Sequence, residues 1–127
     1  MNNLTYLDFA KDEWQYLANA YAKGLRYNAM VSQAQRIAEC YLKQVITKRL
    51  VNNNEVMLSH NLRTIFTYIT EELNLPLHHL HKEVMCLNNF YTHTRYPGKD
   101  AFLASEKDID ACVASLSSII RNLQEYI

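Results

Sequence analysis

Apolar residues recur at three- and four-residue intervals along most of this chain, and only two glycines and two prolines interrupt the pattern. That spacing places the apolar side chains on one face of an α-helix. A β-rich domain needs many turns, which a chain with so few glycines and prolines does not supply. The sequence therefore predicts an all-α domain.

Five segments carry this pattern, so we expect an up-and-down bundle of about five helices. The expected helices cover roughly residues 4–23, 26–51, 59–73, 76–91 and 105–127. The second carries the widest apolar stripe, and we expect it at the centre of the bundle. The length suffices for one hydrophobic core, which predicts a single domain over residues 1–127.

Residues that typically start or stop helices mark the expected boundaries. Gly24 can end the first helix in the left-handed conformation, and the polar run 52–54 can form the loop after the second. Ser59 and Ser105 are candidate N-caps of the third and fifth helices. Pro76 can occupy the first turn of the fourth helix, where its missing N–H costs nothing.

The formal net charge is zero, but basic residues gather between residues 23 and 51. A basic helix in a neutral protein can attract a polyanion, or it can be a solvated surface, and both interpretations stay open. Glu39 and Lys43 in this segment are four residues apart, which is also the spacing of an ordinary ion pair on a helix surface.

The three cysteines, Cys40, Cys86 and Cys112, are widely spaced and fall inside helical patterns. An odd number of such cysteines is typical of reduced thiols, so we expect a cytoplasmic protein. No apolar run approaches the roughly 20 residues that a membrane span requires. We therefore expect no association with a membrane.

A histidine-rich segment at the expected start of the fourth helix contains His78, His79 and His81. Consecutive residues of a helix project about 100° apart, and no cysteine or nearby carboxylate completes a tetrahedral ligand set. We interpret these histidines as a solvated helix start, and we expect neither a metal site nor a cofactor.

The densest polar and aromatic chemistry lies in residues 88–98, between the fourth and fifth helices. Arg95 can bind a phosphate or a carboxylate through two parallel hydrogen bonds. His93 can titrate near neutral pH, while Tyr91 and Tyr96 offer hydroxyl groups and flat faces. This stretch is the first candidate for a ligand site.

Three short motifs, in order along the chain, point to a known family. They are Gln35, Glu39, Leu42 and Lys43 in the second helix, His60 and Leu62 at the start of the third, and Asn88, Tyr91, Arg95, Tyr96 and Pro97 around the end of the fourth. Together with the helical pattern, this set resembles the HEPN family, helical domains found in prokaryotes and higher eukaryotes.

The resemblance implies a homodimer and two main kinds of activity. Some HEPN proteins are non-catalytic modules that bind a nucleotide or accompany a small nucleotidyltransferase, and others are metal-independent ribonucleases that often act as toxins. For the first kind, the ligand-binding candidates in this chain are Arg95, Tyr91, Tyr96, Asn88, His60, Glu39 and Lys43.

The ribonuclease branch is marked by an arginine that is followed, after four to six residues, by a histidine. No arginine of this chain has a histidine at that distance. Asn88 and His93 have the spacing, but asparagine carries no charge and cannot hold a phosphate as arginine does. If the chain is a ribonuclease, the catalytic residues are His93 and Arg95.

Three hypotheses follow from these residues. The leading one is a non-catalytic dimeric module that binds a nucleotide or partners a nucleotidyltransferase, as a member of a toxin–antitoxin type system. The second is a metal-independent ribonuclease, acting on RNA through a degenerate site. The third is a purely structural helical bundle, in which Arg95 pairs with a buried carboxylate such as Glu39. His60 can likewise line a pocket or simply hydrogen-bond near a helix end.

Overall fold

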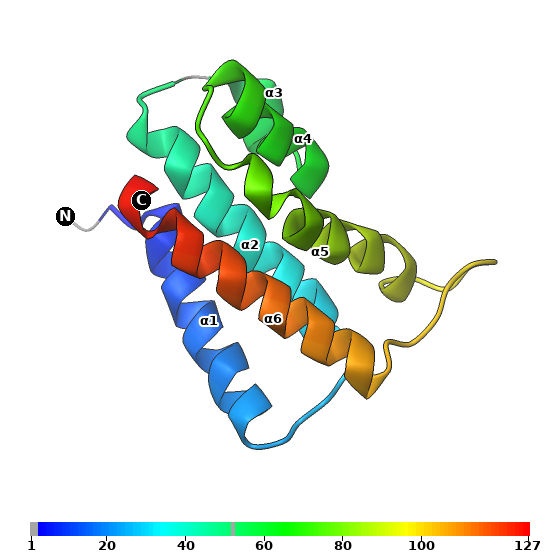
Figure 1. Ribbon diagram of the computed structural model, residues 1–127. Coiled ribbons are helices and arrows are strands. Elements are labelled where there is room, and N and C mark those ends of the chain that lie inside the picture. Colours follow the sequence, from blue (N-terminus) through cyan, green and yellow to red (C-terminus); the bar gives the residue numbers. More distant parts are fainter. Residues whose placement is uncertain (1–2, 52) are drawn as a thin grey trace.

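The computed structural model describes residues 3–51 and 53–127, and the prediction of an all-α bundle is confirmed (Figure 1). The α-helices in these residues are α1 (Tyr6–Ala22), α2 (Ala29–Lys48), α3 (Asn54–Leu58), α4 (Leu62–Thr67), α5 (His81–Thr94) and α6 (Glu106–Leu123). A π-helical turn follows α4 at Tyr68–Glu72, and 3-10 turns occupy His78–Leu80 and Gln124–Tyr126. No strand occurs in this part of the chain.

Helix α2 lies at the centre of the bundle, as its wide apolar stripe predicted. It contacts α1, α4, α5 and α6, and Figure 1 shows it between the α1–α6 side and the α3–α5 side. It begins at Ala29 instead of residue 26, and the side chain of Arg26 ties the segment before it to α6 and to the end of α1. The Arg26 guanidinium binds Asp110 of α6 at 2.8 Å and the carbonyl oxygens of Tyr21 and Leu25.

Two helix boundaries were predicted correctly, the start of α6 at Ser105 and the end of α1 before Gly24. Ser105 caps α6 in a capping box, where its hydroxyl accepts the N–H of Asp108 and the Asp108 carboxylate accepts the N–H of Ser105. Thr5 and Asp8 form the same motif at the start of α1. Gly24 follows α1 with φ +87°, a conformation that glycine adopts without strain.

The expected third helix is instead two short helices, and Ser59 does not cap the second of them. Asn61 caps α4, because its side-chain oxygen accepts the N–H groups of Arg63 and Thr64. Asn53 likewise caps α3, so the polar run starts a helix instead of forming a loop. Asn52 lies outside the described residues.

Pro76 precedes the next helix and does not occupy its first turn. Leu77 is buried, so the chain enters the core directly after the proline. The 3-10 turn then begins at His78 and α5 at His81. None of the helices in residues 3–51 and 53–127 is long and apolar enough to cross a membrane.

The three cysteines are free thiols. Cys86 of α5 and Cys112 of α6 are close enough for their thiols to interact, and this interaction, with that of Ser115, lowers the pKa of Cys86. The same interaction, together with burial, raises the pKa of Cys112.

Candidate functional site

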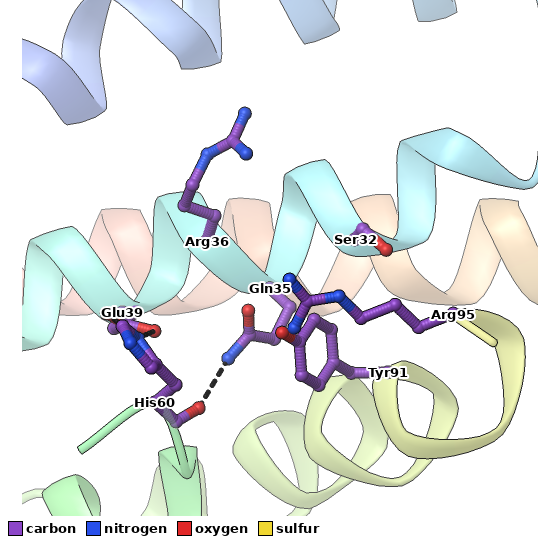
Figure 2. Close-up of a pocket in the computed structure, with 7 residues that line it drawn as sticks. All are labelled: Ser32, Gln35, Arg36, Glu39, His60, Tyr91 and Arg95. Carbon is purple, nitrogen blue, oxygen red and sulfur yellow. Dashed lines mark hydrogen bonds and ion pairs between the residues drawn. The ribbon is translucent and has the colours of Figure 1, made fainter.

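A polar pocket lies between α2 and the end of α5, beside the segment that leads into α4 (Figure 2). Its volume is about 170 Å³. The polar pocket is lined by Ser32, Gln35, Arg36 and Glu39 of α2, by His60 before α4, and by Tyr91 and Arg95 at the end of α5. The structure therefore brings together Arg95, Tyr91, His60 and Glu39, which are candidates from the sequence.

The α2 wall of the polar pocket is a polar stripe on an otherwise buried helix. Gln35 and Arg36 follow Ser32 by three and four residues and precede Glu39 by four and three, so these residues share one helical face. Gln35 is buried, and its side-chain amide donates to the carbonyl oxygen of His60 at 2.8 Å. This bond fixes the segment before α4 against α2.

Glu39 is the buried carboxylate of the site. It is 8% exposed and accepts hydrogen bonds from the Lys43 ammonium at 2.9 Å and from Nδ1 of His60 at 3.0 Å. Lys43 is itself 3% exposed, so this ion pair is buried and is not the surface pair that its spacing suggested. The proposed pairing of Arg95 with Glu39 is wrong, because Lys43 and His60 are the partners of Glu39.

His60 matches both interpretations that its position allowed. Its imidazole contacts Glu39 close to the start of α4, and the same residue lines the polar pocket. The His60 side chain is 75% exposed, whereas the Glu39 side chain that it contacts is 10% exposed.

Arg95 follows α5 directly, and its guanidinium lies over two aromatic rings. Its central carbon is 4.7 Å from the ring centroid of Tyr91 and 5.3 Å from that of Tyr96. Such cation–π contacts orient a guanidinium without using its N–H donors. Among the residues that the structure describes, no carboxylate lies within ion-pair distance of Arg95.

Arg36 is the second guanidinium of the polar pocket, and it is already paired. It binds the Glu13 carboxylate of α1 with N–O distances of 2.7 to 3.0 Å. These hydrogen bonds raise the pKa of Arg36. Figure 2 shows its side chain pointing away from Glu39 toward α1.

A second cavity, the loop groove, adjoins the polar pocket on the far side of Arg95. Its volume is about 390 Å³, and it lies between the end of α5 and the loop before α6. It is lined by Asn28, Thr94, Arg95, Tyr96, Pro97, Ala101, Phe102 and Leu103. Arg95 is common to both cavities.

The remaining candidates lie outside the polar pocket. Tyr96 lines the loop groove, and Lys43 is buried behind Glu39. The Asn88 side chain accepts the N–H of Leu62 at 3.1 Å, which joins α5 to the first residue of α4. His93 lines neither cavity, because its ring stacks on Phe102 at a centroid distance of 6.4 Å.

Ser32 and Arg36 line the polar pocket but were not predicted as site residues from the sequence. Gln35 was named only as part of a family motif. The signal was present, since these residues and Glu39 form a polar stripe at helical spacing along one face of the helix. Polar residues on a core helix need partners, and a stripe of them predicts a cavity or a polar contact.

The fold and this site define an all-helical domain with a polar pocket between its central helix and α5. The family model of the HEPN domain matches residues 5–126, nearly the whole chain. The chain therefore belongs to the HEPN domain family. Comparisons with curated proteins and with solved structures found no match.

Proposed function

We propose that this chain is a non-catalytic HEPN module whose polar pocket binds the phosphate of a nucleotide, with Arg95 as the anchor. The observation that carries the proposal is the Arg95 guanidinium, oriented by Tyr91 and Tyr96 at the pocket and free of any carboxylate among the described residues. A planar guanidinium with unused N–H groups matches the geometry of a phosphate.

The charges around the polar pocket favour an anionic ligand. Lys43 balances Glu39, and Glu13 balances Arg36, which leaves Arg95 as the surplus charge. Pockets for whole small-molecule ligands usually hold about 300–1,000 Å³. At 170 Å³ the polar pocket suits a phosphate group, and the rest of a nucleotide would lie outside it.

The proposal includes a homodimer that forms through the α1–α2 groove, a cavity of about 560 Å³. This groove is lined by Tyr16, Ala20, Leu25, Tyr27, Ala29, Met30, Ser32, Gln33 and Arg36. Tyrosine, methionine and arginine, which all occur in this lining, are enriched at protein interfaces. Because Ser32 and Arg36 line both this groove and the polar pocket, a dimer formed here would bring two polar pockets near each other.

A nucleotidyltransferase partner and a toxin–antitoxin type system also belong to the proposal. Their support is membership of the HEPN family together with the leftover positive charge at Arg95.

Arg95→Ala tests the phosphate-binding role. Charge-assisted hydrogen bonds contribute about 1.5–3 kcal/mol, so we expect AMP to bind roughly ten- to hundredfold more weakly in isothermal titration. We expect the free energy of unfolding to fall by no more than about 1 kcal/mol, since Arg95 is exposed and makes only cation–π contacts.

Arg63→Ala is the matched control, because Arg63 is an exposed arginine of α4 that lines neither cavity. It should leave AMP binding unchanged. An equal loss in both variants, or no AMP binding by the unaltered protein, would contradict the proposal. A large loss of stability in Arg95→Ala would support the structural hypothesis instead.

The ribonuclease hypothesis predicts that His93 and Arg95 act on one phosphate, whereas His93 packs on Phe102 outside both cavities. We therefore expect no efficient cleavage of structured or single-stranded RNA in the presence of a chelator. Electrophoresis of the RNA after incubation with the unaltered protein and with His93→Ala measures this. Cleavage that disappears in His93→Ala would establish the ribonuclease and overturn the non-catalytic assignment.

A further inference from the structure

We infer that the loop groove holds the base of the nucleotide whose phosphate binds beside Arg95. The inference rests on the proposed phosphate-binding role and adds a second subsite to it. Figure 2 shows the Arg95 side chain extending from the end of α5 across the Tyr91 ring toward α2. Since Arg95 also lines the loop groove, a ligand that occupies both cavities must pass it.

The two cavities differ in chemistry. The polar pocket presents hydroxyl, amide and charged groups, whereas the loop groove is lined largely by the apolar and aromatic side chains of Tyr96, Pro97, Phe102 and Leu103. A ligand that fits both has an anionic group joined to a flat, mostly apolar group. A nucleotide has this composition, and its base can stack on an aromatic side chain.

The walls of the loop groove are held in place from both sides. The Asn28 amide donates to the carbonyl oxygen of Thr94 at 2.8 Å, and its oxygen accepts the N–H of Ala104 at 2.8 Å. The N–H of Phe102 bonds the carbonyl oxygen of His93 at 3.0 Å. The groove is therefore formed before any ligand binds, which reduces the entropy lost on binding.

Phe102 is the best stacking surface in the loop groove. Its ring is held edge-on by Phe90, with centroids 6.2 Å apart, and stacks on His93. It nevertheless stays 42% exposed, so part of the ring remains available. A fixed and partly exposed aromatic ring supports a base without first having to be ordered.

Asn28 and Thr94, two polar residues of the loop groove, have their hydrogen-bonding groups committed, and Arg95 is assigned to the phosphate. Both polar atoms of Asn28 are bonded to the loop ends, and the Thr94 hydroxyl donates to the carbonyl oxygen of Phe90 at 2.8 Å. Base recognition then depends on stacking, which every base can provide. The site should accept purine and pyrimidine nucleotides with similar affinity.

Titration with AMP, UMP and ribose 5-phosphate tests the inference, because ribose 5-phosphate lacks the base. Stacking on aromatic side chains contributes about 1–3 kcal/mol per base, so AMP should bind roughly five- to hundredfold more tightly than ribose 5-phosphate. UMP should bind within about tenfold of AMP. Phe102→Ala should remove most of this advantage and leave the affinity for ribose 5-phosphate unchanged.

Two further variants make the result decisive. Leu103→Ala is a second groove variant that should keep the fold, because Leu103 is exposed, and it should weaken the binding of AMP without weakening that of ribose 5-phosphate. Phe9→Ala removes an exposed aromatic ring of α1 far along the chain from the groove and should change neither affinity.

The outcomes separate this inference from the phosphate proposal. If AMP binds no more tightly than ribose 5-phosphate, while both depend on Arg95, the base subsite is wrong and the phosphate site stands. If Phe102→Ala weakens both ligands equally, the base subsite is also wrong. If neither ligand binds, both proposals fail.

Discussion

Glu39→Met should lower the free energy of unfolding by about 3 kcal/mol or more, because the substitution leaves the Lys43 ammonium buried without its partner. Lys43 lies 3% exposed in the middle of α2, so water does not replace the lost carboxylate. Urea or thermal denaturation followed by circular dichroism measures the change.

Two variants control this experiment. Glu13→Met breaks the more exposed pair with Arg36 and should cost less than about 1 kcal/mol. The double variant Glu39→Met/Lys43→Met should regain most of the stability, because replacing both members of a buried pair by apolar residues is often neutral. If Glu39→Met costs no more than Glu13→Met, the buried pair does not have the role assigned to it.

Sedimentation velocity at micromolar concentration should show a dimer, and Tyr27→Glu should weaken its association by about thirtyfold or more. Tyr27 is exposed in the α1–α2 groove, where a new charge on each copy would be desolvated by the interface. Leu50→Glu places the same charge on an exposed apolar residue outside this groove and should leave the dimer intact. A protein that sediments as a monomer at every concentration would contradict the proposed homodimer.

Local sequence signals predicted the long helices and two of their boundaries, the start of α6 and the end of α1. The pattern of residues 105–127 and the Ser105 cap led directly to α6, because a capping box uses only neighbouring residues. The helix boundaries in the region after α2 were harder to predict. Asn61 and Ser59 are both good caps, and burial of Leu62 against the core decides where α4 begins.

The residues of the polar pocket were predicted only in part, because the sequence shows side-chain chemistry but not which helices pack together. Arg95 and Tyr91 were recognised by their chemistry, and both line the polar pocket. The prediction that Arg95 pairs with Glu39 was wrong. The distance between α2 and α5 is set by packing, and residue spacing does not encode it. The spacing did indicate the observed ion pair, since Lys43 follows Glu39 by one helical turn. Spacing alone could not show that this pair is buried.

Because Asn28 holds both ends of the loop before α6, the length of this loop can change in evolution without disturbing the helices. As the N-cap residue of α2 it makes no capping bond with its side chain, which instead joins Thr94 to Ala104. The ends of the loop are therefore fixed, whatever lies between them. Doubling the length of a flexible loop costs only about 0.6 kcal/mol, so insertions near the exposed Gly98 would reshape the groove while leaving the bundle intact. A change of loop length alone would therefore alter the size of this groove in related chains.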